Sequence, residues 1–435
     1  MKRGLGTVVV SLSLLLGPVR ASQDGLDLPF SSARWAGDLL FVSGQVGNMP
    51  GEFRLVEGGI QGETRQALEN IRDVLKDHGA SLDDVVKCTV MLADISEWEA
   101  MNRIYVEFFP PPRPARSALG ADGLALGARV EIECVASVPR VTARPLEEAG
   151  LETGSFTEEI SGRQIHYAVH GQGPPLMVVP NSWGLSLEGL RGLLEPLEKH
   201  LTVVYFDPRG MGSSGPASVD EDLSMAAVRE DFHRLREHLG LEMVHALGWS
   251  NGATNLVYLA HERSETLASA IFVHGVPRFA PADMEAMAAR YPKLFQRFGE
   301  VQAQLESGDL TPAEQDAAMR ELYVEEWFPE TLAHPERILE AMQEAFAKAE
   351  MSWRHARYAQ QEVPALDQRP LLGEIPVPAL VIAGRHDALP PERAEELASG
   401  LPRARFVVFG DSGHFAPIEE RHRFVDLVTS FVGVR

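Results

Sequence analysis

Ser250 is the residue whose surroundings most clearly point to covalent chemistry. It stands between two glycines in Gly248-Trp249-Ser250-Asn251-Gly252, after the apolar segment MVHAL and before the helical run ATNLVYLAHE. A strand, a sharp turn and a helix in this order lift a serine hydroxyl clear of a sheet, and the helix N-terminus favours negative charge. The motif therefore predicts a nucleophilic serine.

A serine hydroxyl is a weak nucleophile at its ordinary pKa, so a base and an orienting acid are also needed. They are expected in the chain order Ser, Asp, His. Asp387 follows the apolar segment PALVIAG, and His414 follows RFVVFG. Each would project from the carboxyl end of a strand, where open α/β sheets place their sites. We predict Asp387 as acid and His414 as base, and the neighbouring His386 and Asp411 stay open as alternatives.

The same chemistry needs N–H donors for the oxyanion that develops on the substrate. One is expected from the main chain of Asn251, the residue after the serine. The other is expected from the loop after PLMVVP, which reads Asn181-Ser182-Trp183-Gly184. The sequence leaves open which of Asn181, Ser182 and Trp183 donates.

A mainly parallel sheet must position these groups. From residue 156 the chain alternates apolar segments with helical stretches, and the segments are IHYAVHG, PLMVVPN, LTVVYFD, MVHALGWS, SAIFVHG, PALVIAG and RFVVFG. Such continuous apolar runs are typical of strands buried on both faces. The fold class expected here is α/β, with a crossover helix from about residue 223 to 239.

The strand pattern stops between residues 277 and 372, where a helical insertion is predicted to form a lid over the strand ends. Its aromatic and methionine side chains are more typical of the lid's own core than of substrate contacts. Three lid carboxylates, Glu325, Glu326 and Glu330, could bind a substrate ammonium group, although a solvated acidic face is the favoured interpretation.

The amino-terminal part reads as a separate α+β domain over residues 22–140. Strands are predicted at 39–47, 85–92 and 129–138, with two helices between them. The first helix ends at Gly79. The second begins in a capping-box pattern at Ser96 and is expected to bury Trp98, Met101, Tyr105 and Phe108. A segment rich in Pro, Gly and Glu, placed at 141–155, is the expected linker to the second domain at 156–435.

Composition narrows the choice of partners and cofactors. A net charge of −22 argues against nucleic acid, because a phosphate-binding surface needs clustered Lys and Arg. No His, Cys or carboxylate cluster has metal-ligand spacing, so neither metal nor cofactor is expected. Cys88 and Cys134 each lie in an apolar strand-like segment, and the favoured interpretation is two buried thiols, with a disulfide as the alternative.

The first 21 residues have the pattern of a signal peptide. Lys2 and Arg3 precede an apolar run from Val8 to Leu16, and small residues precede an expected cleavage after Ala21. The apolar run is shorter than the roughly 20 residues needed to span a bilayer. We therefore expect export to the periplasm or the medium, without a membrane anchor after cleavage.

Residues 156–435 resemble the α/β-hydrolase fold family, of the AB hydrolase-1 type. Besides Ser250, Asp387 and His414, the turn Asp207-Pro208-Arg209-Gly210-Met211-Gly212-Ser213-Ser214 matches that family. The resemblance implies a serine hydrolase that cleaves an ester or amide of a small substrate through an acyl-enzyme. Many members of the family, including the proline iminopeptidases, carry His-Gly-Gly-type glycines in the oxyanion loop, and this chain does not. A proline iminopeptidase-like aminopeptidase is therefore the alternative and not the main prediction.

Residues 29–138 resemble the RidA (YjgF) family of enamine/imine deaminases. The matching pieces are Pro29-Phe30-Ser31, Val42-Ser43-Gly44-Gln45, Asn102, Pro114-Ala115-Arg116-Ser117 and Val130-Glu131-Ile132-Glu133. The resemblance implies that Arg116 binds a substrate carboxylate and that Glu131 lies close to the reacting water. It also implies a homotrimer with sites between subunits. Ala118 stands where many active members carry cysteine, so a binding or assembly role is the alternative to deamination.

Overall fold

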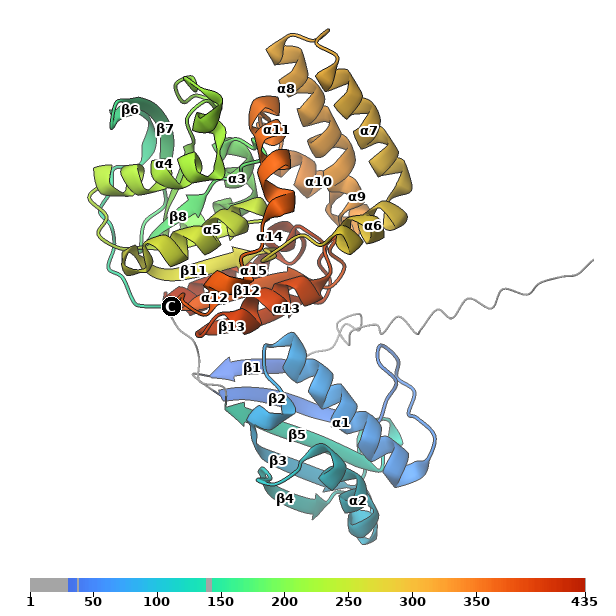
Figure 1. Ribbon diagram of the computed structural model, residues 1–435. Coiled ribbons are helices and arrows are strands. Elements are labelled where there is room, and N and C mark those ends of the chain that lie inside the picture. The colour runs from blue at the N-terminus through green and yellow to red at the C-terminus, as the bar shows by residue number, and fades with distance from the viewer. Residues whose placement is uncertain (1–29, 37–38, 138–142, 435) are drawn as a thin grey trace, which may run out of the picture. The chain divides into compact units, whose positions relative to one another are not determined.

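The computed structural model describes residues 30–36, 39–137 and 143–434, which form two compact units, the first built from residues before 138 and the second mainly from residues 143–434 (Figure 1). The predicted signal peptide, residues 1–21, lies outside the described residues. None of the described helices is both long and apolar enough to cross a bilayer.

The first unit is a five-stranded sheet in the order β1-β2-β5-β3-β4, with two helices over its apolar face (Figure 1). The bounds of its strands are β1 Ala33–Ala36, β2 Leu39–Val46, β3 Val85–Leu92, β4 Ala115–Gly120 and β5 Val130–Ser137. The three predicted strands are β2, β3 and β5 in the middle of the sheet. The pattern missed β1 and β4 because edge strands bury little and so lack a clear apolar alternation.

The helices of this unit are α1 (Gly59–Asp77) and α2 (Trp98–Phe108). The apolar side chains of α1 are buried, as are Met101 and Tyr105 of α2, and those of α1 are Ala67, Leu68, Ile71, Val74 and Leu75. The prediction for the start of α2 was wrong, because Ser96 lies in a preceding 3₁₀ turn where its N–H donates to Asp94. Because the helix begins only at Trp98, this side chain lies in the first turn and faces solvent, and the prediction that it is buried was wrong.

The cysteines depart from the expected pair of free thiols. Cys88 of β3 lies directly opposite Cys134 of β5 in the antiparallel register, with their Cα atoms 4.1 Å apart, and the two sulfurs form a disulfide. The two cysteines are 46 positions apart in the sequence, which hides this proximity, because only the strand register places their side chains on the same face.

The second unit is an eight-stranded sheet in the order β13-β12-β11-β10-β8-β9-β7-β6. Its strands are β6 Gly154–Ile160, β7 Arg163–His170, β8 Pro175–Val179, β9 Thr202–Asp207, β10 Val244–Trp249, β11 Leu267–Val273, β12 Ala379–Gly384 and β13 Ala404–Phe409. The six strands from β13 to β9 are parallel, whereas β7 and β6 add an antiparallel edge. The expected mainly parallel sheet is therefore present.

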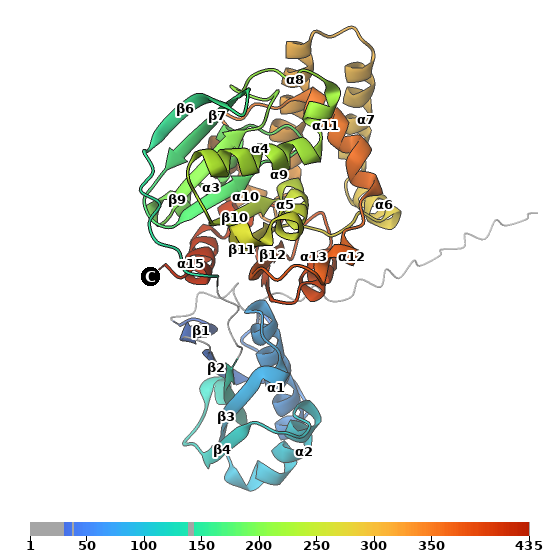
Figure 2. The same cartoon turned by 60° about the vertical axis from the view of Figure 1, so that its left-hand side comes forward.

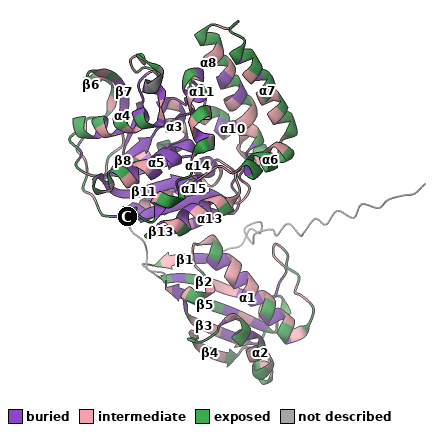
Figure 3. Cartoon of the chain, viewed as in Figure 1, coloured by how far each residue is buried: buried purple, intermediate pink, exposed green. Residues whose placement is uncertain are grey.

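Helices cover both faces of this sheet (Figure 2). One face packs against α3 (Leu187–Leu194) and α15 (Arg421–Val432). The other packs against α4 (Met225–His238), α5 (Asn251–Glu262) and α13 (Pro391–Gly400). The five strands β8 to β12 are buried along their whole length, as Figure 3 shows in purple, whereas most of the edge strand β6 is partly or fully exposed.

The insertion between β11 and β12 is helical, as expected for the predicted lid. It contains α6 (Pro281–Arg290), α7 (Pro292–Glu306), α8 (Pro312–Arg320), a π-helix (Glu321–Trp327), α9 (Phe328–Glu330), α10 (Pro335–Ala345), α11 (Trp353–Glu362) and α12 (Arg369–Leu372). The helices α7 and α8 lie side by side in both views (Figures 1 and 2). Their outward surfaces are exposed (Figure 3).

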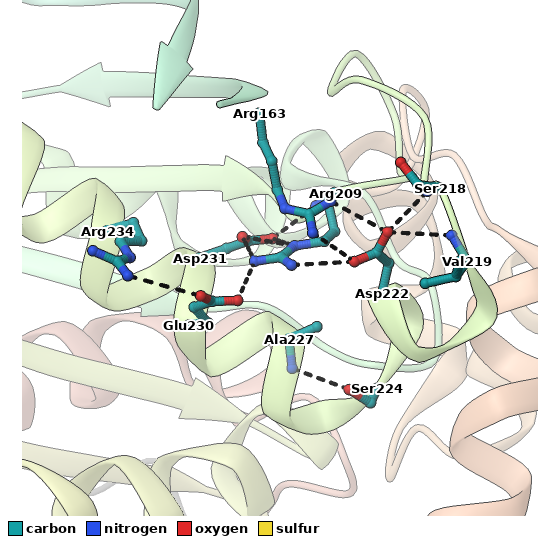
Figure 4. Close-up of polar contacts among 10 residues, drawn as sticks. All are labelled: Arg163, Arg209, Ser218, Val219, Asp222, Ser224, Ala227, Glu230, Asp231 and Arg234. Carbon is teal, nitrogen blue, oxygen red and sulfur yellow. Dashed lines mark hydrogen bonds and ion pairs between the residues drawn. The ribbon is translucent and has the colours of Figure 1, made fainter. Parts of the chain in front are cut away.

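The turn after β9 is anchored by one buried arginine. Arg209 donates from its main-chain N–H and its guanidinium to Asp231 of α4, and its guanidinium also contacts Asp222 and Glu230. Figure 4 shows the guanidinium between these three carboxylates. A buried cation needs such partners to offset its lost hydration, and the network holds the turn against α4.

Candidate active site

Ser250 occupies the sharp turn between β10 and α5. Its φ of 54° and ψ of −122° are unusual for a residue with a side chain. A Cβ on Gly248 would lie 2.4 Å from the Gly252 oxygen, and one on Gly252 would lie 2.6 Å from the Val179 oxygen. The two glycines are therefore required by close backbone approach, and the Ser250 N–H is held by the Val273 carbonyl at 2.8 Å.

The structure brings Ser250, His414 and Asp387 into one hydrogen-bonded row, which we call the triad. His414 Nε2 lies 3.0 Å from Ser250 Oγ. On the other side of the ring, Nδ1 lies 2.9 Å and 3.1 Å from the two oxygens of Asp387. The neighbours His386 and Asp411 have other surroundings, because the His386 ring faces His334 and the Asp411 N–H donates to Glu420.

Asp387 is buried and accepts hydrogen bonds on both oxygens. Burial alone would raise the pKa of its carboxyl group, but the imidazoles of His414 and His274 lower that pKa well below its usual range. His274, at the end of β11, places Nδ1 2.7 Å from Asp387 Oδ2. The sequence reasoning missed this residue. Its only signal was a polar residue directly after a central apolar strand, in SAIFVHG.

The loop that carries His414 is held on both sides. Glu419 of α14 (Ala416–Glu419) accepts hydrogen bonds from the N–H groups of Gly413 and Phe415, at 2.9 Å and 3.0 Å. Burial raises the pKa of this carboxyl group. Trp249 donates from Nε1 to the His414 carbonyl at 3.0 Å. These bonds keep the imidazole facing the serine.

The predicted oxyanion loop has its own hydrogen bonds. The Ser182 N–H donates to Asn251 Oδ1 at 2.8 Å, and the Trp183 N–H donates to Asn181 Oδ1 at 2.7 Å. Both N–H groups therefore already bind asparagine side chains. The Asn251 N–H lies in the first turn of α5, where main-chain donors have no partner within the helix.

Aromatic lid residues approach this loop. The Trp183 ring centroid lies 6.4 Å from that of Tyr323 in the π-helix, which packs in turn on Phe298, Trp327 and Phe328. Aromatic side chains therefore connect the predicted oxyanion loop to the lid.

The lid carboxylates are mostly engaged elsewhere. Glu325 pairs with Arg320 at 2.8 Å, and Glu326 pairs with Arg297 at 3.0 Å. Glu330 is exposed on α9. Two of the three acidic groups thus have cationic partners within the lid itself.

Among the described residues, His274, Asp387 and His414 place ligand-type atoms within 4.8 Å of one another. In this cluster each imidazole directs Nδ1 at the carboxylate, and a neutral imidazole binds a metal only through a nitrogen that carries no proton. The arrangement therefore suits proton handling better than metal coordination.

The predicted residues of the first unit form two separate groups. Glu131 lies against Gly44, where a Cβ would sit 2.0 Å from its Oε1, and Ser43 adjoins Gly44 on β2. Burial, with a smaller effect of Glu133, raises the pKa of Glu131. Arg116 instead lies over the ring of Tyr105 at 4.5 Å.

The strand register explains this separation. Arg116 of β4 pairs with Cys88 of β3, whereas Glu131 of β5 pairs with Met91. Because side chains alternate along a strand, Arg116 and Glu131 face opposite sides of the sheet. Asn102 lies on α2, the helix whose Tyr105 contacts Arg116. One chain therefore does not bring the predicted set together.

Two family models match the chain. Residues 26–138 match the model described as Endoribonuclease L-PSP, and residues 175–421 match the one described as alpha/beta hydrolase fold.

Two curated proteins are similar to the first segment. The chain is 41% identical over 110 residues to Reactive Intermediate Deaminase A, chloroplastic, of Arabidopsis thaliana, covering 25% of this chain and 59% of that protein's length. It is 42% identical over 108 residues to the 2-iminobutanoate/2-iminopropanoate deaminase of Homo sapiens, covering 25% of this chain and 79% of that protein.

Solved structures share the fold of the second segment. An alpha/beta fold family hydrolase from Bacillus anthracis str. Sterne aligns at 22% identity with a TM-score of 0.53, covering 64% of this chain and 99% of that chain. A hydrolase from Pseudomonas aeruginosa PA01 aligns at 25% identity with a TM-score of 0.50, covering 65% and 99%.

Proposed function

We propose a function from the premise that this chain belongs to the α/β-hydrolase fold family and carries a domain of the Endoribonuclease L-PSP family before it. The proposed activity is hydrolysis of an ester or amide of a small substrate through an acyl-enzyme at Ser250. The observation that carries this proposal is the 3.0 Å distance between His414 Nε2 and Ser250 Oγ, with Asp387 on the far side of the ring.

The proposed mechanism begins when Ser250 Oγ attacks the substrate carbonyl carbon and His414 Nε2 takes the hydroxyl proton. Asp387 holds the imidazole in orientation and stabilises the imidazolium that forms. The tetrahedral intermediate collapses as His414 gives the proton to the leaving oxygen or nitrogen. A water molecule, activated by His414, then attacks the acyl-enzyme and releases the acid and free Ser250.

The oxyanion of the intermediate requires N–H donors. In the proposal the Asn251 main chain supplies one, and Ser182 or Trp183 supplies the other. Since both loop N–H groups are bonded to asparagine oxygens in this structure, the oxyanion must replace the Asn251 or the Asn181 side chain as acceptor. A charged oxygen is the stronger acceptor, so this exchange is favourable.

The test is a substrate panel on purified protein, comparing p-nitrophenyl esters of short and long acyl chains, with Ser250→Ala as the control. Labelling of Ser250 by a fluorophosphonate measures the nucleophile directly. We expect ester turnover and labelling that both disappear in Ser250→Ala. A folded wild-type protein that is neither labelled nor active would overturn the proposal.

The same panel separates esterase from aminopeptidase activity when Pro- and Ala-p-nitroanilides are included. Because Glu325 and Glu326 already pair with lid arginines, we propose the esterase-like activity as the main one. Anilide turnover without ester turnover would favour the aminopeptidase and would assign the substrate ammonium to Glu330 or its neighbours.

For the first domain we propose either imine hydrolysis or assembly of the chain. The support is its similarity to proteins named as deaminases, together with Arg116 and Glu131 on opposite faces of one sheet. A common site for these two residues then requires a second chain, as in the homotrimer that the family resemblance implies. Sedimentation measures the number of chains. Release of ammonia from 2-iminopropanoate, compared between wild type and Arg116→Ala, measures the chemistry.

We also propose that the protein is exported. The support is the signal-peptide pattern of residues 1–21. Amino-terminal sequencing of the protein recovered from the producing cells tests this proposal, and a mature chain that begins at Ser22 is the expected result.

A further inference from the structure

A second histidine, outside the triad, shares the acid with the base. Asp387 Oδ2 lies 2.7 Å from His274 Nδ1 and 3.1 Å from His414 Nδ1. The two imidazole centroids are 5.1 Å apart. The other oxygen, Oδ1, accepts from His414 and from the Leu389 N–H at 3.0 Å. The carboxylate therefore has donors in several directions, and His274 makes the shortest of these contacts.

The surroundings of His274 fix which nitrogen carries its proton. The main-chain N–H of Ala416 points at His274 Nε2, 3.3 Å away. A nitrogen that accepts a hydrogen bond carries no proton, so the proton of a neutral ring lies on Nδ1. That proton faces Asp387. Burial lowers the pKa of His274 despite the nearby carboxylate, so the ring is a neutral donor at neutral pH.

The backbone places this ring with little freedom. His274 has a φ of 55°, a left-handed conformation that few residues with a side chain adopt. Its N–H donates to the Ile382 carbonyl of β12 at 2.8 Å, and its side chain is completely buried. Residues that combine a strained backbone conformation with complete burial and fixed hydrogen bonds are often found at functional sites.

We propose that His274 is a positioning residue for hydrolysis at Ser250, an inference that rests on the proposed function. The Nδ1–H group of the His274 side chain holds Asp387 in the rotamer that meets His414. Its hydrogen bond also weakens the negative charge that the carboxylate presents to His414. Without His274, the Oδ2 atom of Asp387 would keep only His414 as a hydrogen-bond partner. The carboxylate would then rotate more freely, and its stronger negative charge would hold a proton on His414 more tightly. Loss of His274 should therefore slow the reaction and also move the acid limb of the pH–rate profile to higher pH.

Other charged or titratable groups also face Asp387. Arg290 donates to its main-chain carbonyl, and Tyr291 follows at the end of α6. Glu419 of α14 is near enough for the charge of Asp387 to contribute to its raised pKa. The experiment leaves these three groups unchanged, so a shift between variants reports on His274.

The experiment compares two substitutions at this position. His274→Leu removes the donor while keeping an apolar side chain of similar reach. His274→Asn keeps an N–H close to the place of Nδ1, and asparagine tolerates the left-handed backbone better than most residues. The matched control is His245→Leu on β10, which removes a completely buried histidine of the same sheet whose partner is Ser269. The readouts are kcat/KM for the preferred ester from pH 5.5 to 9, fluorophosphonate labelling rate and thermal midpoint.

We expect His274→Leu to lower kcat/KM by about 10- to 100-fold, the usual range for loss of a group that orients another functional group, with KM little changed. Its acid-limb midpoint should rise by about half a pH unit or more. His274→Asn should recover most of the rate and return the midpoint to that of wild type. His245→Leu should lower the thermal midpoint without moving the pH profile.

Two results would overturn the inference while leaving the proposed function intact. One is a labelled, active wild type whose His274→Leu variant keeps its rate and pH profile. The other is a rate loss in His274→Leu that matches the loss of folded protein, with no change of midpoint and no rescue by asparagine. A wild type that does not react with the fluorophosphonate would overturn the proposed function itself, and this inference with it.

Discussion

Arg290 donates from both ends of its guanidinium to the main chain that carries Asp387. Nη1 lies 2.8 Å from the Asp387 carbonyl, and Nη2 lies 3.0 Å from the carbonyl of His386. Arg290 is the last residue of α6, the first helix of the lid. The lid and the loop of the acid are thus connected by a charged side chain whose planar fork suits two acceptors.

We predict that Arg290→Leu lowers kcat for the preferred ester by about tenfold. Without this contact the loop that carries Asp387 would shift, and His414 would be oriented less well toward Ser250. The thermal midpoint should change little, since Arg290 lies at the surface of the lid. Arg297→Leu is the control, because it removes a lid arginine whose partner is Glu326. Equal rates for the Arg290 and Arg297 variants would show that the contact with the acid loop has no role in the reaction.

The Arg209 network predicts unequal effects of two acids on one helix. Asp231 is buried with Arg209, whereas Glu230 is half-exposed and contacts the same guanidinium. Asp231→Ala should lower the free energy of unfolding by about 3 kcal/mol or more, since it removes the main partner of a buried charge. Glu230→Ala should cost less than about 1 kcal/mol. Denaturant titration measures both, and similar losses would contradict the burial argument.

The buried His245 predicts a pH-dependent stability. Burial lowers its pKa to about 4, from 6.5 in an unfolded chain. Between pH 6.5 and pH 4 the unfolded chain binds a proton on His245 more tightly than the folded chain does. The contribution of the neutral ring to the free energy of unfolding is therefore fully present above pH 6.5 and is lost as the pH falls toward 4. The free energy of unfolding of wild type should fall by about 2–3 kcal/mol relative to His245→Leu between pH 7 and 4.5. Parallel curves for the two proteins would rule out this titration.

The register of β3 and β5 predicts a disulfide within one chain. Iodoacetamide should not label Cys88 or Cys134 in unfolded, unreduced protein, and should label both after reduction. The midpoint of unfolding of the first domain should also fall on reduction, because a closed loop of this length restricts the unfolded chain. Two labelled cysteines before reduction, measured by mass spectrometry, would show that the thiols are free in the isolated protein.

Local pattern was sufficient where neighbouring residues decide the structure. Gly248 and Gly252 permit the tight turn in which they themselves lie, so the motif can be recognised without knowing the rest of the fold. Continuous apolar runs likewise indicate central strands, whatever the order of those strands in the sheet. For this reason the sequence alone determined the two folds, the mainly parallel sheet, the helical insertion and the candidates Ser250, Asp387 and His414. It left the neighbouring His386 and Asp411 open as alternatives, and only the structure gives these two residues other surroundings.

Only the tertiary structure decided which distant groups meet. His274 reaches Asp387, and Cys88 reaches Cys134, because strand order and register set their neighbours, and neither is visible in local sequence. The same holds for Arg116 and Glu131, which matching motifs predicted as site residues but whose side chains face opposite sides of the sheet. Hydrogen bonds and covalent bonds form over about 2–3 Å, whereas the residues that make them are tens to more than a hundred positions apart along the chain. That separation of scales is the physical reason why the sequence could name the candidate groups but not their partners.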